Sequence, residues 1–141
     1  MAFWKWKRSA SSTEEDHGAA ALTTRRRGQA AEDRALAHLQ RAGLRLAARN
    51  YRTPGRGGGE IDLIMQDSGG ALVFVEVRAR ADAAHGGAAG SITATKRRRI
   101  VLAARHYLLR YGDAPPPCRF DVVAIEGEAL HWLPAAFDAP E

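Results

Sequence analysis

Two acidic residues, Asp62 and Glu76, lie in neighbouring segments whose sequences are typical of β-strands. Glu76 interrupts an otherwise apolar run over residues 72–77, where an unpaired carboxylate would be costly to bury. Two carboxylates at hydrogen-bonding distance repel each other when both are ionised, and a divalent cation removes this repulsion. Mg²⁺ and Mn²⁺ prefer such oxygen ligands, and either cation can activate water and polarise a phosphate. The pair is therefore suited to phosphodiester hydrolysis with Mg²⁺ (or Mn²⁺) as the cofactor.

The two residues alone favour a different interpretation, in which Glu76 pairs with a nearby arginine and Asp62 caps a turn. The carboxylates can meet only if the hairpin between them has a five-residue loop, residues 67–71. A four-residue loop would place Asp62 opposite Val75 and separate the acids. We expect the five-residue loop because it also puts three apolar residues of the first strand on the valine face of the second, namely Ile61, Leu63 and Met65.

The elements that must position this pair follow from the spacing of apolar residues. Small apolar residues at helical spacing predict a first helix, which Gly43 ends. Alternation and turn residues predict the strands, and a second apolar face predicts a longer helix after them. The expected ranges are helix 28–42, strands 44–51, 60–66 and 72–80, helix 95–111, and strands 118–125 and 129–133. The order α-β-β-β-α-β-β predicts an α/β (α+β) fold with helices packed on a mixed sheet.

The chain of 141 residues is long enough for one domain. Residues 1–24 lack a sustained period and are expected to form a disordered basic and aromatic tail, with a single domain over residues 25–141. No apolar run approaches membrane-spanning length and no secretory signal is recognisable, so we expect a cytoplasmic protein with no membrane partner. The single cysteine, Cys118, excludes an internal disulfide and is expected in the core.

A net charge of +5 and a pI near 10 favour a polyanionic partner, with nucleic acid and above all DNA as the candidate. Residues 1–56 carry twelve Lys and Arg against five Asp and Glu, so the positive charge is concentrated there and in the cluster 96–99. A solvated surface explains such a charge almost as well. The residues that we expect to contact nucleic acid are Arg25, Arg26, Arg27, Arg52, Arg56, Arg80, Lys96 and Arg97.

The motif over residues 59–64, followed by that over residues 73–80, resembles the YraN family of small bacterial proteins of uncertain function. That family is placed, by fold and motif, with the restriction-endonuclease-like PD-(D/E)xK nucleases and is similar to archaeal Holliday junction resolvases. The resemblance runs from about Arg27 through Asp138 and takes in the segments 28–32, 49–52, 95–96, 118–123 and 136–138. It implies a restriction-endonuclease-like mixed β-sheet flanked by helices.

By this resemblance Asp62 is the central metal ligand, Glu76 the second and the Val77 carbonyl a third, with Glu32 as an additional acid from the first helix. Arg78 stands where the motif has a lysine. An arginine stays charged and cannot act as a general base, although it can stabilise negative charge on a phosphate. Two further acids near the motif are expected to form salt bridges as supporting groups rather than to bind metal, namely Glu60 and Asp121.

The sequence thus leads to one functional hypothesis and two alternatives. The first is a Mg²⁺-dependent endonuclease that hydrolyses DNA phosphodiester bonds, with branched or damaged DNA as candidate substrates. A homodimer is the simplest arrangement for cutting two strands. The first alternative is a nucleic-acid-binding module that keeps a nuclease scaffold without turnover, in which the arginines matter more than the acids. The second is a protein-interaction subunit with an exposed apolar patch.

Overall fold

The computed structural model of the chain describes residues 12–55, 57–80 and 92–140. By their internal contacts, residues 1–30 and 31–141 form two separate compact units. Among the described residues, no helix is both long and apolar enough to cross a bilayer. The elements are α1 (Ser12–Arg41), β1 (Arg45–Arg52), β2 (Glu60–Gln66), β3 (Leu72–Arg80), α2 (Ala94–Leu108), the 3-10 helix η3 (Leu109–Tyr111), β4 (Cys118–Glu126) and β5 (Ala129–Phe137).

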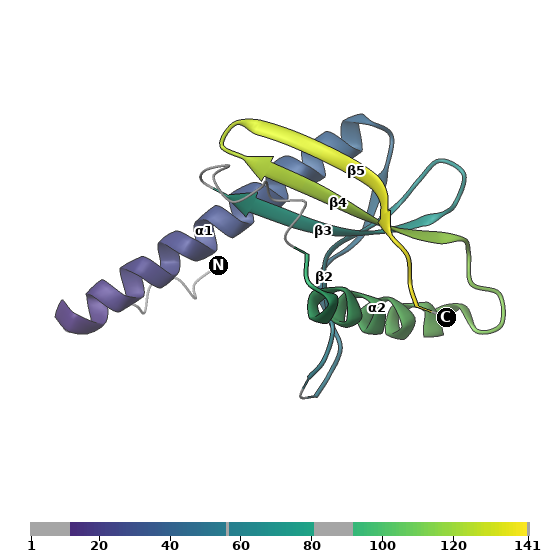
Figure 1. Cartoon of the computed structure of the whole chain (residues 1–141), viewed down its shortest axis with the longest axis horizontal. Coiled ribbons are helices and arrows are strands. Elements are labelled where there is room, and N and C mark those ends of the chain that lie inside the picture. The colour runs from purple at the N-terminus through teal and green to yellow at the C-terminus, as the bar shows by residue number, and fades with distance from the viewer. Residues whose placement is uncertain (1–11, 56, 81–91, 141) are drawn as a thin grey trace, which may run out of the picture. The chain divides into compact units, whose positions relative to one another are not determined.

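The five strands form one mixed sheet in the order β1-β2-β3-β4-β5 (Figure 1). β3 and β4 run parallel, and the other neighbouring strands are antiparallel. The parallel pair requires a crossover connection, and α2 lies within that connection. The predicted order of helices and strands and the mixed sheet are therefore confirmed.

The hairpin between β2 and β3 has the expected five-residue loop, because Gln66 pairs with Leu72 and Leu63 pairs with Val75. Asp67 closes the loop, since its Oδ1 accepts hydrogen bonds from the backbone N–H groups of Gly69 and Ala71, each at 2.9 Å. Continued by one residue, this register places Asp62 opposite Glu76. The expectation on which the acidic pair depends is confirmed.

The two faces of the sheet carry separate hydrophobic cores. On one face, Leu63, Met65 and the β3 valines pack with the part of α1 from Ala31 onward. On the other face, Phe74 packs with α2 and with Phe120 of β4. Ile61 belongs to this second core, so the expectation that it shares the valine face was wrong. Ile61 lies beyond the last residue pair of β2 and β3 but still pairs with Tyr51 of β1, so strand alternation alone does not decide its face.

Helix α1 begins at Ser12, well before the expected start at residue 28. Residues 12–24, which were expected within the tail, are therefore helical. Acidic residues 14–16 suit a helix N-terminus and alanines 19–21 are strong helix formers, so propensity extends the helix where apolar periodicity is weak. Residues 1–11 lie outside the described part, so the disorder expected there stays a prediction.

Smaller departures occur toward the C-terminus. Cys118 is exposed because it is the first residue of β4 and precedes the buried stretch of that strand. The expectation that it lies in the core was therefore wrong. β5 runs to Phe137 rather than to residue 133, and Phe137 stacks on Phe120 with ring centroids 5.0 Å apart. The expected second helix ends at Leu108 and continues as the 3-10 helix η3.

The loop between β1 and β2 is fastened close to α2. A Cβ atom on Gly59 would lie 2.1 Å from the Arg99 carbonyl oxygen and 2.6 Å from the Ala103 nitrogen, so only glycine allows this approach. The Gly59 N–H donates to Thr53 Oγ1 at 2.6 Å, and the Thr53 N–H donates to the Gly59 carbonyl at 3.0 Å. These contacts hold Glu60 and the start of β2 beside the helix.

Candidate functional site

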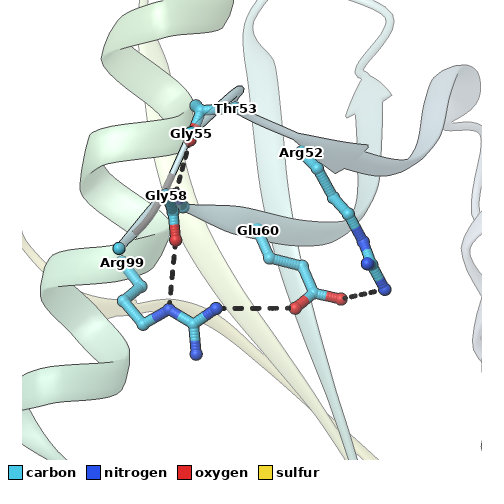
Figure 2. Close-up of a pocket in the computed structure, with 8 residues that line it drawn as sticks. Arg52, Thr53, Gly55, Gly58, Glu60 and Arg99 are labelled. Carbon is cyan, nitrogen blue, oxygen red and sulfur yellow. Dashed lines mark hydrogen bonds and ion pairs between the residues drawn. The ribbon is translucent and has the colours of Figure 1, made fainter.

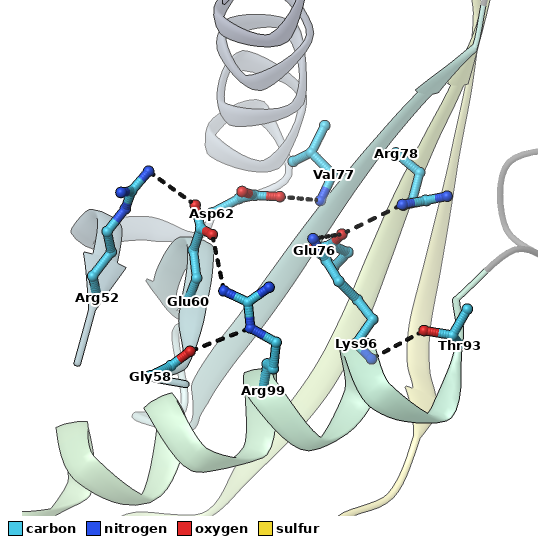
Figure 3. Close-up of polar contacts among 10 residues, drawn as sticks. All are labelled: Arg52, Gly58, Glu60, Asp62, Glu76, Val77, Arg78, Thr93, Lys96 and Arg99. Carbon is cyan, nitrogen blue, oxygen red and sulfur yellow. Dashed lines mark hydrogen bonds and ion pairs between the residues drawn. The ribbon is translucent and has the colours of Figure 1, made fainter. Parts of the chain in front are cut away.

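The two acids of the motif meet where β2 and β3 separate. Glu76 extends from the centre of β3 and is only 3% exposed. The carboxyl groups of Asp62 and Glu76 are within hydrogen-bonding reach of each other. Asp62 Oδ2 also accepts a hydrogen bond of 2.8 Å from the Val77 N–H (Figure 3). The Asp62 side chain therefore satisfies a backbone donor of β3 and is held beside Glu76 by it.

Two cations contact the same oxygen of Glu76. Lys96 Nζ lies 3.4 Å from Glu76 Oε2, and an Arg78 guanidinium nitrogen lies 4.0 Å from it. Lys96 comes from the first turn of α2, where Thr93 caps the helix by accepting a 3.0 Å hydrogen bond from the Lys96 N–H. Figure 3 shows Glu76 pointing toward Lys96 and Arg78. A lysine thus contacts the acidic pair from α2, whereas the lysine position of the motif, occupied here by Arg78, lies on β3.

Burial decides the protonation of the pair. It is the largest cause that raises the pKa of Glu76 to about 8, the negative charge of Asp62 adds to it, and Lys96 opposes it. Burial also raises the pKa of Asp62, against the hydrogen bond from Val77 and the charge of Lys96. The pair therefore holds a proton at neutral pH, and a divalent cation would have to displace that proton to bind.

Glu32 of α1 is a third acid within electrostatic range of this pair. Burial raises its pKa most, the charge of Asp62 raises it further, and Arg49 lowers it. Arg49 binds Glu32 through a 3.4 Å ion pair and also contacts Asp33 at 2.7 Å. In the part of the chain that the structure describes, no three His, Cys, Asp or Glu side chains form a metal-binding group. Glu32 thus lies within electrostatic range of Asp62, and its role as an additional acid of the site stays a prediction.

The two supporting acids are salt-bridged, as expected. Glu60 forms ion pairs with Arg52 at 3.3 Å and with Arg99 at 4.0 Å. Asp121 is fully buried, and its Oδ atoms accept from Arg119 Nε at 3.0 Å, Trp132 Nε1 at 2.9 Å and the Ala135 N–H at 2.9 Å. Asp121 therefore stabilises the irregular pairing of β4 and β5 and lies outside the acidic pair.

The residues expected to contact nucleic acid are placed unequally. Arg52 and Arg97 are exposed, and the Arg97 guanidinium lies 5.9 Å from the Phe137 ring centroid. Lys96 is half-buried and lies 3.4 Å from a Glu76 carboxylate oxygen. Arg25, Arg26 and Arg27 are exposed on α1 but belong to the other compact unit, Arg80 is the last residue of β3, and Arg56 lies outside the described residues.

Sequence reasoning counted Arg99 only as part of the basic cluster 96–99, and it missed the contacts of Arg99 with Glu60 and of Lys96 with Glu76. A signal was present, because residues three apart on a helix share a face and Lys96 and Arg99 have that spacing. The positive first turn of α2 also has an explanation in the structure. Its charges oppose the helix dipole, but Lys96 faces Glu76 and Arg99 faces Glu60, so acids of the sheet offset the cost.

Comparison with known proteins agrees with the motif. Residues 31–125 match the family described as Uncharacterised protein family UPF0102. The chain belongs to the UPF0102 family. A UPF0102 protein of Paracidovorax citrulli is 74% identical over 83% of this chain and 86% of its own length. Another from an Acidovorax species is 69% identical over 86% of this chain and 91% of its own length. The YraN-type resemblance is confirmed at the level of this family.

The raised pKa of Glu76 predicts a pH dependence of stability. Because this pKa is about 8 in the native state against 4.5 ordinarily, the native state binds more protons than the unfolded state in that window. The free energy of unfolding should then fall as pH rises from about 4.5 to about 8, by up to about 1.4 kcal/mol per pH unit.

Glu76→Gln should remove this slope in chemical denaturation without metal. Glu128→Gln, at an exposed turn, should keep it. Parallel profiles for wild type and Glu76→Gln would contradict the assignment.

Proposed function

We propose that the protein is a Mg²⁺- or Mn²⁺-dependent endonuclease that hydrolyses phosphodiester bonds of DNA at Asp62 and Glu76. The observation that carries the proposal is the buried contact of these two carboxyl groups, which keeps a proton that a cation would replace. The resemblance of the surrounding motif to PD-(D/E)xK nucleases supports the same chemistry. A restriction-endonuclease-like scaffold is part of this proposal.

The ligand atoms present fit such a cation. Mg²⁺ is usually held by one or two carboxylates, keeps several waters and takes further oxygens from substrate phosphates. Asp62 and Glu76 supply the two carboxylates, and the Val77 carbonyl is the third protein oxygen that the resemblance assigns. When bound, the cation would polarise the phosphate, activate water and orient both for in-line displacement.

The two cationic side chains beside the pair have different roles in the proposed hydrolysis. Hydrolysis forms a bond from the water oxygen to phosphorus and breaks the bond to the leaving oxygen, so one proton leaves the water and one reaches the leaving group. Of the two cations that contact Glu76, Lys96 can exchange a proton, whereas the Arg78 guanidinium stays charged. We assign to Lys96, in its ammonium form, donation of a proton to the leaving oxygen, and to Arg78 stabilisation of negative charge on the phosphate. Solvent takes the proton of the attacking water and returns one to Lys96.

DNA as the substrate is supported by the charge of the chain. The net charge of +5 favours phosphate backbones through counterion release. Arg52 and Arg97 are exposed in the same unit as the acidic pair. Branched or damaged DNA is the proposed class because of the resemblance to Holliday junction resolvases, and two-strand cutting would be simplest in a homodimer.

One observation favours a second candidate function, a nucleic-acid-binding module without turnover. Arg78 occupies the position of the motif's lysine and cannot replace it as a base. In that case the acids would be dispensable for binding, and neutralising the arginines would weaken it. The two functions make opposite predictions for substitutions of Asp62.

Cleavage assays with branched and linear DNA in Mg²⁺ or Mn²⁺ test the proposal. Asp62→Asn should lower the cleavage rate by at least about 100-fold because it removes a charge that holds the cation. The matched control is Asp113→Asn, an exposed acid outside the pair, which should cleave like wild type. Salt-sensitive binding by wild type with no cleavage would establish the binding module instead. Equal cleavage by wild type and Asp62→Asn would point to a contaminant.

The role of Lys96 can be separated from its ion pair. Lys96→Arg keeps a positive charge beside Glu76 but loses proton transfer, so kcat should fall by about 100-fold or more and the pH–rate profile should change. Arg78→Lys keeps the charge beside the phosphate and should retain most of the activity. Thermal unfolding of each variant controls for the fold. A Lys96→Arg enzyme with wild-type kcat would exclude Lys96 as the proton-transfer residue.

A further inference from the structure

A polar recess lies beside the acidic pair, between residues 53–55 and 57–59 on one side and α2 on the other. Its cavity volume is about 280 Å³. Arg52, Glu60 and Arg99 line it together with Thr53 and the backbone of the glycines of the loop. Figure 2 shows the Arg52 and Arg99 side chains reaching the Glu60 carboxylate from opposite sides, one from β1 and one from α2.

The ion pairs inside this recess are loose. Arg52 lies 3.3 Å from one Glu60 oxygen and Arg99 lies 4.0 Å from the other. The Arg52 side chain is 73% exposed and that of Arg99 is 48% exposed, so water screens both pairs and each contributes little to stability. An arginine presents five N–H donors in a fork that suits a phosphate. Most of that capacity remains open to a ligand here.

Arg99 is aimed by the backbone. Its Nε donates to the Gly58 carbonyl at 3.2 Å, which fixes the plane of the guanidinium group above the loop. The close approach of Gly59 to the Arg99 carbonyl holds the loop against this turn of α2. The recess is therefore built by contacts between two elements and does not depend on a single mobile side chain.

The recess and the acidic pair are neighbours, because β2 and α2 each contribute one residue to the recess and a nearby residue to the pair. Glu60 and Asp62 are two residues apart on β2, which separates their Cα atoms by about 6–7 Å. Arg99 and Lys96 are three residues apart on α2, which places their Cβ atoms about 5–6 Å apart on one face. This separation is comparable with that of neighbouring phosphates along one nucleic-acid strand.

We propose that Arg52 and Arg99 bind the phosphodiester next to the one at the acidic pair. This proposal rests on the proposed function, because it assumes that the acidic pair acts on a phosphodiester. It requires a substrate strand with consecutive phosphates. Glu60 competes for the same guanidinium groups and must yield them when the phosphate arrives. The protein should therefore discriminate against esters with a single phosphate, which cannot gain the second contact.

Binding measured without turnover tests this directly. The probe is a fluorescently labelled single-stranded oligonucleotide, followed by anisotropy over a range of salt concentrations with Ca²⁺ in place of Mg²⁺. Arg99→Gln and Arg52→Gln should each weaken binding by about tenfold at low salt. Each should also lower the slope of log affinity against log salt by about 1. Arg105→Gln, an exposed arginine farther along α2, is the matched control and should leave both quantities unchanged.

The variant Glu60→Gln gives a result of opposite sign. It removes the competing carboxylate, so oligonucleotide affinity should rise several-fold. If Glu60 serves only to hold the fold together, affinity should be unchanged or should fall together with the melting temperature. Arg99→Gln and Arg52→Gln variants that bind like Arg105→Gln would overturn the proposal.

Cleavage and binding measurements together separate the role of the recess from that of the acidic pair. If no DNA is cleaved but the two arginine variants lose affinity and slope as expected, the endonuclease assignment fails and the recess stands. If Asp62→Asn abolishes cleavage but the arginine variants bind and cleave like Arg105→Gln, the endonuclease stands and the recess fails. For an active enzyme, Arg99→Gln should lower kcat/KM for the oligonucleotide and leave that for bis(p-nitrophenyl) phosphate unchanged.

Discussion

The site depends on the burial of Glu76 beside Asp62. A carboxylate that is 3% exposed in the middle of a valine-rich strand loses its hydration, and a second acid next to it adds repulsion. The native state reduces this cost by keeping a proton on the pair, by the Val77 N–H that binds Asp62, and by Lys96, which lies 3.4 Å from Glu76. A divalent cation would offset the same cost with higher charge, and for this reason we propose that the pair is a cation-binding site.

Helix α2 supplies the positive side of the site. Its first turns carry no acidic residue, and their charges oppose the helix dipole, so as an isolated helix they would be unfavourable. Against the sheet, Lys96 faces Glu76 and Arg99 faces Glu60, so each helix cation is matched to an acid. Gly59 makes this possible because a side chain there would collide with the helix backbone. The acidic pair and the recess are thus two polar sites that both use residues of α2 and β2.

Much of the fold could be predicted from the sequence because it is determined by local patterns. Turn residues 67–70 and the alternation of apolar residues fixed the β2–β3 register, and with it the meeting of Asp62 and Glu76. Contacts between distant segments could not be predicted in this way. The crossover that brings Lys96 to Glu76 leaves no periodic signal in either segment. Ile61 packs in the core on the α2 side, although alternation along β2 predicts the other face. The early start of α1 reflects helix propensity without amphipathic spacing.

Calorimetric titration of the metal-free protein with Mn²⁺ at neutral pH, in two buffers of different ionisation enthalpy, tests the central claim most directly. Because the pKa of Glu76 is about 8, its proton must leave when a cation takes the carboxylate pair. Wild type should bind Mn²⁺ and release about one proton per cation, and Glu76→Gln should bind much more weakly without that release. Absence of binding by wild type, or equal binding by Glu76→Gln with no proton released by either protein, would contradict the account.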